Sequence, residues 1–362
     1  MSDEIKALAT NMVGRKKSGA DSYIIFLGAG ASISSEASSM MQIVDDVLES
    51  QDSKQFDELQ VTIQKAASIN SEYGELKRQE INRIKRDQFF KIWRRLDHES
   101  QYAILRKHLW ENKTPSDGYV DLAHLIKLGY IKMILSTNLD NLLEKSLRSE
   151  DLYPPEDFIV IKNGKDRPEE VVEQLNNRGH FKLIKLHGSL ESPGSYAFTT
   201  EEVFDFEKTI KPHLSRIINQ SLIVIGHSMQ DRDIDILFDD EGKEIHFVRP
   251  TPPEIESRID TILKVRRQGS IIKGDDGKFD TFFRKLRLYV KKDSKEMSTS
   301  SLSIEGFLRS IGYDHELEVP RSRFRNLPTL YVKPTEYNDI CSKLEREHVV
   351  FIIGEPHLGK TY

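Results

Sequence analysis

The feature that most constrains the fold is an unbroken apolar run, Tyr-Ile-Ile-Phe-Leu at 23–27, which ends at Gly28. A run without polar alternation is typical of a strand that is buried on both faces, as in a parallel sheet. Further apolar runs predict strands at 131–136, 158–161, 181–186, 222–225 and 244–248, and we expect helices at 4–16, from about Ser34, and at 119–128. This alternation predicts an α/β fold with a Rossmann-like parallel sheet and helices on both of its faces.

The chain of 362 residues exceeds two domains of ordinary size, which are about 150 residues each. Residues 52–113 are highly charged and nearly free of Gly and Pro, which predicts a helical subdomain inserted between strands. The polar, Ser-rich stretch at 291–304 is typical of a linker. We therefore expect one α/β domain at 1–290 with its insertion at 52–113, a linker at 291–320 and the start of another domain at 321–362.

Charge and cysteine content exclude several classes of protein. With 53 Lys and Arg against 58 Asp and Glu, the net charge of −5 provides no global field to hold nucleic acid or anionic lipid. The single cysteine, Cys341, excludes a disulfide within the chain and a zinc site built on cysteine pairs. No apolar run approaches about 18 residues, and the first residues lack the pattern of a signal peptide. We expect a soluble cytoplasmic protein without a membrane partner.

Three predicted strands end in polar clusters. These are Thr-Asn-Leu-Asp at 137–140, His-Gly-Ser at 187–189 and Gly-His-Ser-Met-Gln-Asp at 226–231. In an open parallel sheet, ligands bind beyond the carboxyl ends of the strands. We therefore expect these clusters and the loop at Gly28 to face one crevice.

Each cluster taken alone allows a structural interpretation beside a functional one. Gly-Ala-Gly-Ala-Ser at 28–32 could bring backbone amides to a pyrophosphate, but Ile33 replaces the third glycine of the dinucleotide motif, and an ordinary strand-to-helix turn also explains two glycines. Asn138 and Asp140 could each cap a helix. His187 could be a hydrogen-bonded core histidine.

Together, the four segments follow the order and approximate spacing of the NAD-binding core of sirtuins. Residues 1–290 resemble the sirtuin-like domains of bacterial antiviral defence proteins. The resemblance implies that the glycine loop binds the NAD diphosphate, that the Asn and Asp position the nicotinamide ribose and water, and that the His acts as a base. It places the diphosphate on Gly28, Ala29, Gly30 and Ser32, the ribose and water on Asn138 and Asp140, the base on His187, and further NAD contacts on Thr137, Gly226, Ser228 and Asp231.

Departures from the family pattern bear on the reaction. Deacetylating sirtuins have a zinc ribbon of four cysteines, which one cysteine cannot supply, and Ser-Ser-Met-Met at 38–41 replaces their Pro-Asp-Phe-Arg-like stretch. Thr137 also replaces their Gln. These differences favour water over an acyl-lysine as the nucleophile. Cleavage of the nicotinamide bond passes through an oxocarbenium-like centre, for which Asn138 would orient the ribose or water and neutral His187 would accept a proton.

A second motif lies near the end of the sequence. Gly-Glu-Pro-His-Leu-Gly-Lys-Thr at 354–361 matches the Walker A pattern through Gly354, Gly359, Lys360 and Thr361, after an apolar run at 349–353. Residues 320–362 resemble the entry to a STAND-type NTPase, which implies ATP and Mg²⁺ in a full-length protein. The sequence stops before the other parts of such a domain, so we expect a piece of a longer protein that does not hydrolyse ATP.

The insertion contains a basic stretch, for which a solvated helix face and a contact between protomers are both open interpretations. Its members are Lys77, Arg78, Arg83, Lys85, Arg86, Lys91, Arg94 and Arg95.

These observations predict an NAD glycohydrolase effector without zinc that releases nicotinamide and ADP-ribose or cyclic ADP-ribose. The resemblance implies antiphage defence by NAD depletion and abortive infection, with a phage protein as trigger and activation by assembly into a tetramer or filament. Three alternatives remain: an NAD-dependent deacylase, a non-catalytic module that senses NAD or ADP-ribose, and a nucleic-acid-binding NTPase fragment.

Overall fold

A computed structural model gives the structure of the chain and divides it into two compact units, Met1–Gly312 and Tyr313–Tyr362. It describes residues 2–50, 61–64, 74–163, 166–176, 180–191, 196–198, 210–229, 232–238, 242–253, 257–266 and 268–298. The predicted Walker A residues, the predicted NTPase segment and Cys341 lie outside the described residues, as does Asp231.

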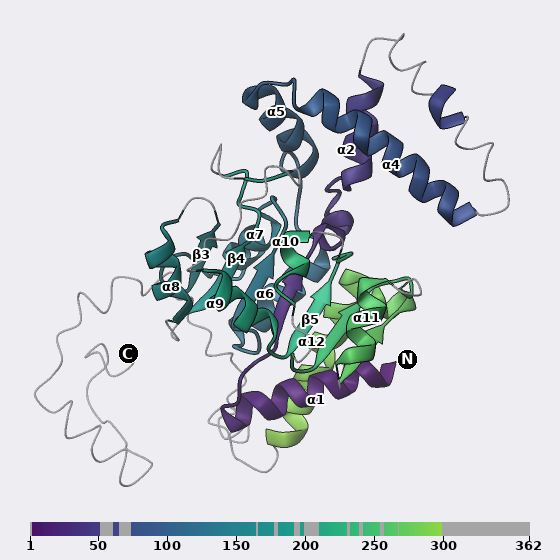
Figure 1. The fold of residues 1–362 in the computed structure, drawn as a ribbon. Helices are drawn as coiled ribbons and strands as arrows, with labels where there is room; N and C mark the ends of the chain where they lie inside the picture. Colours follow the sequence, from purple (N-terminus) through teal and green to yellow (C-terminus); the bar gives the residue numbers. More distant parts are fainter. Residues whose placement is uncertain are drawn as a thin grey trace, which may run out of the picture. The chain divides into compact units, whose positions relative to one another are not determined.

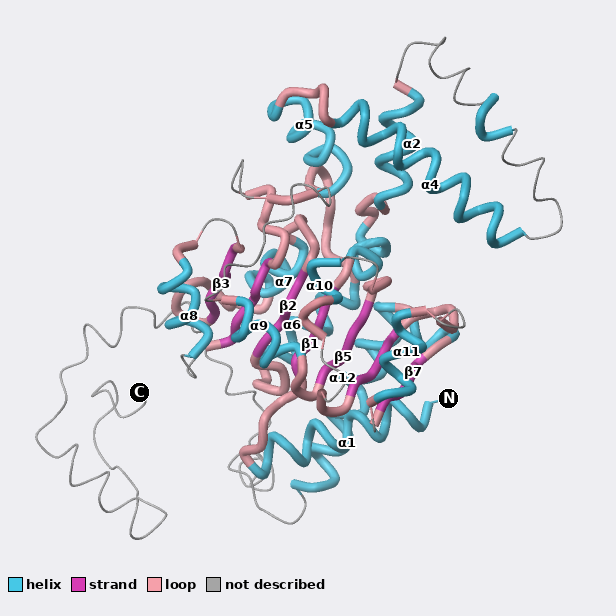
Figure 2. The backbone as a smooth tube through the Cα atoms, in the orientation of Figure 1, coloured by secondary structure: helices cyan, strands magenta, loops and turns pink. Residues whose placement is uncertain are grey.

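A parallel sheet forms the centre of the described part, in the order β3-β4-β2-β1-β5-β6-β7 (Figure 2). The strands are β1 (Ile24–Leu27), β2 (Met133–Ser136), β3 (Phe158–Lys162), β4 (Phe181–Lys185), β5 (Leu222–Ile225), β6 (Ile245–Val248) and β7 (Gly269–Ile272). β1 pairs with β2 on one side and with β5 on the other, so the strand order reverses there. This switch point is where an open α/β sheet forms its ligand crevice.

Helices cover both faces of this sheet, which confirms the predicted Rossmann-like fold (Figure 1). One face packs on α1 (Ser2–Ser18), α6 (Asp117–Lys127), α7 (Leu142–Ser149) and α12 (Phe279–Ser298). The other packs on α8 (Pro168–Asn176), α9 (Lys211–Ile218), α10 (Arg232–Asp235) and α11 (Arg258–Val265). In β1, Ile25 and Leu27 join the first core and Ile24 and Phe26 the second, because successive side chains of a strand point to opposite faces. No helix in the described ranges is long and apolar enough to cross a membrane.

The helix predicted to begin at about Ser34 begins later. A 3-10 helix, η1 (Ala29–Ser35), follows β1 directly and ends at Glu36, whose φ of 62° breaks the helical path. The α-helix α2 (Met40–Glu49) then begins after Ser39, which forms a capping box with Gln42. The prediction for Ser34 was wrong because Ser34 lies within η1, and the N-cap of the α-helix, Ser39, lies five residues further along the chain.

The helical insertion has a core of its own. α4 (Gly74–Trp93) and α5 (His98–Leu109) pack with α2, and Phe89 and Trp93 are buried against Ile43, Val47 and Leu105. The described part of the predicted insertion is therefore helical, and α2 belongs to the same packing unit.

Two elements in the C-terminal half differ from expectation. β7 was not predicted, since Gly-Ser-Ile-Ile contains only a short apolar pair. α12 continues to Ser298, where the sequence had indicated a linker from residue 291. Its apolar face reaches Val290, and one turn later Asp293 accepts a 2.6 Å hydrogen bond from Thr10 of α1. This contact holds the polar end of α12 on the sheet domain.

Candidate active site

A cavity of about 480 Å³ lies at the carboxyl ends of the central strands. Residues from all four predicted clusters line it: Ala29, Ser32, Thr137, Asn138, Asp140, His187, Gly226 and Ser228. The structure thus brings together segments that are as much as 200 residues apart in the sequence. Within the described ranges, no group of three or more His, Cys, Asp or Glu side chains is arranged to hold a metal ion.

Gly28 and Gly30 do not line this cavity, because they pack against the loop after β5. A Cβ on Gly28 would lie 2.5 Å from Gly226 O, and one on Gly226 would lie 2.4 Å from Ala31 N. Gly226 also has a φ of 71°, which other residues rarely adopt. The glycines therefore allow two strand-end loops to meet backbone to backbone, and Ala29 and Ser32 are the loop residues that reach the cavity.

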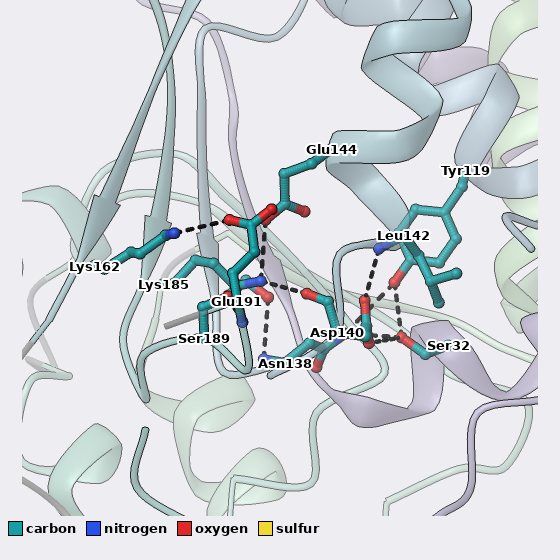
Figure 3. Close-up of polar contacts among 11 residues, drawn as sticks. Ser32, Tyr119, Asn138, Asp140, Leu142, Glu144, Lys162, Lys185, Ser189 and Glu191 are labelled. Carbon is teal, nitrogen blue, oxygen red and sulfur yellow. Dashed lines mark hydrogen bonds and ion pairs between the residues drawn. The ribbon is translucent and has the colours of Figure 1, made fainter. Parts of the chain in front are cut away.

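Ser32 is the centre of a buried hydrogen-bond cluster beside the cavity (Figure 3). Its hydroxyl donates to Asp140 Oδ2 at 2.7 Å and accepts from Asn138 Nδ2 at 3.0 Å. Tyr119 OH lies 2.8 Å from the same oxygen. Because the only proton of Ser32 goes to the carboxylate, the Tyr119 hydroxyl is the donor in this pair.

Tyr119 comes from α6 and was not among the predicted site residues. Burial, reinforced by the charge of Asp140, raises the pKa of Tyr119 well above its usual value, so the hydroxyl keeps the proton that it donates to Ser32. The sequence offers one signal, because Tyr119 begins the helix predicted at 119–128 and a tyrosine hydroxyl that becomes buried needs a hydrogen-bond partner. The identity of that partner depends on the tertiary structure.

Asn138 has one side-chain atom without a partner. Its Nδ2 is held by Ser32, whereas its Oδ1 is buried and accepts no hydrogen bond within the described structure. A buried acceptor in this state costs about 1–3 kcal/mol unless a ligand or water donates to it. Asn138 lines both this cavity and a second, smaller cavity of about 10 Å³ that Tyr119 and Lys185 also line.

Asp140 uses both carboxylate oxygens inside the protein. Oδ2 accepts from Ser32, and Oδ1 accepts from Leu142 N at the first residue of α7, at 3.1 Å. Asp140 precedes Asn141, the N-cap residue of α7, so Asp140 is not itself the cap, although its carboxylate holds Ser32 and also accepts from the first amide of the helix.

A buried ion pair fixes the turn that contains Asp140. Lys185, at the end of β4, lies 3.1 Å from Glu144 of α7, and Lys185 Nζ also donates to the backbone oxygen of Asp140 (Figure 3). Lys185 is 1% exposed and Glu144 is 3% exposed. Removing either partner would leave a buried charge uncompensated.

His187 enters the cavity from the turn after β4. Its backbone oxygen accepts from Ala197 N at 2.9 Å, and Gly188, with a φ of 77°, turns the chain immediately afterwards. The side chain is half-buried and lines the same cavity as Asn138. His227 lines it as well, and its ring forms a T-shaped pair with that of Phe26.

The insertion supplies the rest of the cavity wall. Met40 and Ile43 of α2, Leu109 of α5 and Phe90 of α4 contribute apolar surface, together with Phe198. From the basic stretch, Arg83 and Arg86 also line the cavity. The basic stretch is therefore not a fully solvated helix face over its whole length, because these two arginines face the cavity.

Comparison with known proteins finds a family model, described as a SIR2-like domain, that matches residues 132–251 and includes three of the four clusters. No curated protein matches the chain. Among solved structures, a structure of Sir2 enzymes is 15% identical with a TM-score of 0.41 and covers 82% of this chain and 100% of its own. A Sir2 homologue–NAD complex is 14% identical with a TM-score of 0.39 and covers 81% and 94%, respectively. The family match therefore extends from the residue before β2 to a few residues beyond β6.

Proposed function

We propose that this chain is an NAD glycohydrolase, which cleaves the bond between nicotinamide and ribose with water as the nucleophile. The observation that carries the proposal is the buried Asn138 Oδ1, an acceptor without a partner within the described structure, in a cavity that His187 also lines. The SIR2-like match over 132–251 and the solved Sir2 homologue–NAD complex support NAD as the ligand class.

The proposed reaction balances with water alone. The bond from ribose to nicotinamide breaks, nicotinamide leaves as a neutral molecule, and the water oxygen bonds to the ribose carbon to give ADP-ribose. A hydroxyl of the ribose that attacks in place of water would give a cyclic product. The proton released by the attacking oxygen goes to His187, which acts as general base.

The hydrogen-bond cluster gives Asn138 a fixed orientation for this reaction. Its Nδ2 donates to Ser32, and Ser32 is held in turn by Asp140. Oδ1 then accepts from a ribose hydroxyl or from the attacking water. A site that holds reactants in position lowers the barrier by removing the entropy cost of aligning them.

Nicotinamide release from NAD by purified protein tests the proposal. We expect Asn138→Ala and His187→Ala to lose about 100-fold or more of the rate while remaining folded. His124→Ala, on α6 and outside the cavity lining, is the matched control and should keep the parental rate. Parental rates in folded Asn138 and His187 variants would remove these assignments.

The same assay separates the alternative functions. Turnover of an acyl-lysine peptide that consumes NAD would identify a deacylase and contradict water as the nucleophile. Tight binding of NAD or ADP-ribose without nicotinamide release would identify a sensing module.

We further propose that NAD cleavage serves antiphage defence and is controlled by assembly through a STAND NTPase region. The support is the Walker A pattern at 354–361 and the resemblance of residues 320–362 to such an NTPase, for which we propose ATP and Mg²⁺ as ligands and a phage protein as trigger. An NAD hydrolase without control would deplete the NAD of its own cell. Rates measured on size-separated monomer and oligomer test this, because a monomer that cleaves NAD at the full rate contradicts the control by assembly.

A further inference from the structure

The cavity has few groups that could balance a ligand's negative charge. Its described lining contains two cationic side chains, Arg83 and Arg86, together with two carboxylates, Asp87 and Asp140. The histidines His187 and His227 complete its titratable groups. A diphosphate brings two negative charges, and their burial is costly unless cations or hydrogen-bond donors pair with them.

The glycine loop supplies few of the required donors. Gly28 N donates to Ile225 O at 3.0 Å, Gly30 N to Gly226 O at 2.9 Å, and Ala31 N to Gly28 O at 3.0 Å. Three of the four backbone amides from Gly28 to Ala31 are therefore engaged within the protein. Among the described hydrogen bonds, only the Ala29 amide remains to donate to a ligand. The hydroxyl proton of Ser32 is committed to Asp140 as well. A phosphate at this loop therefore needs donors from elsewhere.

Arg86 is the side chain best able to provide them. Its Nε donates at 3.4 Å to Asn82 O within α4, and no carboxylate of the described residues forms an ion pair with it. Its neighbour Asp87 lines the same cavity, and among the described contacts it forms no ion pair with Arg86. Both terminal nitrogens of Arg86 remain to bind an anion in the forked geometry that suits phosphate.

Arg83 is placed one turn earlier but is already engaged. Its Nη2 and Nε donate to the carboxylate of Glu80 at 2.7 and 3.0 Å. Arg83 therefore adds positive charge to the cavity wall, whereas Arg86 has terminal N–H donors that form no hydrogen bond among the described residues.

α4 is connected to the glycine loop through the insertion. Lys85 of α4 forms a 2.9 Å ion pair with Asp45 of α2, and α2 begins five residues after η1 ends. His108 of α5 lies 2.9 Å from Ser38 Oγ, and the Ser38 amide donates to the backbone oxygen of His108 at 3.1 Å. The wall with Arg86 and the loop with Ala29 thus belong to one connected structure.

We propose that Arg86 of the helical insertion binds the diphosphate of the dinucleotide, with Arg83 adding positive charge beside it. This inference rests on the proposed NAD site and names the group of the ligand that the insertion recognises. The insertion is then part of the binding site, and it supplies the donors that the backbone of the glycine loop uses for its own packing.

Calorimetric binding of ADP-ribose and of adenosine to the 362-residue chain tests the inference. We expect Arg86→Gln to weaken ADP-ribose binding by about tenfold or more, since a hydrogen bond between charged groups is lost, and to leave adenosine binding unchanged. Arg86→Lys should recover part of the affinity through charge alone. Arg95→Gln removes an exposed arginine just beyond α4, outside the cavity lining, and should change neither ligand.

The outcomes separate this inference from the proposed function. If the parent binds ADP-ribose and Arg86→Gln binds it equally well, the role of Arg86 is wrong and the NAD site stands. If Arg86→Gln weakens adenosine as much as ADP-ribose, Arg86 acts on the fold of the cavity and the inference is again wrong. If the parent binds neither NAD nor ADP-ribose, the proposed function and the inference both fail.

Discussion

Ser32, in the loop after β1, donates a 2.7 Å hydrogen bond to Asp140, which follows β2, across 108 positions of sequence. Asn138 and Tyr119 complete the cluster around the Ser32 hydroxyl. Because this hydroxyl has one proton and that proton goes to Asp140, the directions of the other hydrogen bonds follow from it. The cluster that orients Asn138 therefore consists of four residues, Asn138 included, from three separate segments.

Tyr119→Phe removes the donor to Ser32 without changing the packing of the ring. We expect nicotinamide release to slow through kcat more than through KM, because Ser32 and Asn138 lose their fixed orientation, with a stability loss of about 1 kcal/mol. Tyr102→Phe is the matched control, since its hydroxyl donates at 3.2 Å to Leu190 O and does not contact Ser32. The Tyr102→Phe variant should lose a similar free energy of unfolding and should keep the parental rate of nicotinamide release. Equal rates for Tyr119→Phe and the parent would contradict a positioning role.

Lys185→Met leaves Glu144 buried without its cationic partner. We expect a loss of about 3–5 kcal/mol in the free energy of unfolding, measured by chemical denaturation. The double variant Lys185→Met with Glu144→Leu removes both charges and should be less destabilised than the sum of the two single variants. Additive losses would show that the two charges are not coupled across their 3.1 Å contact.

Gly226→Ala tests the close contact between the two strand-end loops. The new methyl group would meet Ala31 N at 2.4 Å, and φ of 71° adds backbone strain. Gly274→Ala has nearly the same φ, 69°, with nothing within 4 Å of the new carbon. The control should therefore lose only about 1–2 kcal/mol, from backbone strain. Gly226→Ala should lose more, and equal losses in denaturation would argue against the close contact.

The lowered pKa of His246 predicts that the folded chain loses stability in mild acid. Burial, with a further contribution from the charge of Arg15, lowers the pKa of His246 on β6, although Glu244 acts in the opposite direction. The unfolded chain then binds the proton more readily than the folded chain. The free energy of unfolding that this histidine contributes above about pH 6.5 is lost as the pH drops below that value. The loss is about 1.4 kcal/mol for each unit by which the pKa in the folded chain lies below that in the unfolded chain.

Denaturation at pH 8 and pH 5 measures this effect. His246→Gln should lose less stability than the parent between the two values. His98→Gln replaces an exposed histidine of α5 and should follow the parent. Parallel curves for His246→Gln and the parent would exclude His246 as the source.

The parts of the fold that could be predicted are those with a local sequence signal. The apolar run before Gly28 predicts β1, because a short continuous apolar run that ends at a glycine is typical of a strand buried on both faces, and the polar clusters mark where strands end. β7 could not be predicted in this way, since its short apolar pair becomes a strand only by pairing with β6. The start of α2 was misplaced for a similar reason, because η1 first packs against the loop of Gly226.

The sequence by itself determined the α/β fold and the segments that meet at the carboxyl ends of the strands, because hydrophobic periodicity and turn residues act over a few neighbouring positions. Only the tertiary structure decided that Tyr119 supports Ser32, that Gly28 and Gly30 pack against Gly226, and that Arg86 reaches the cavity. Those relations depend on how distant elements pack, and no local pattern encodes which hydrogen-bond donors the packing will leave unused.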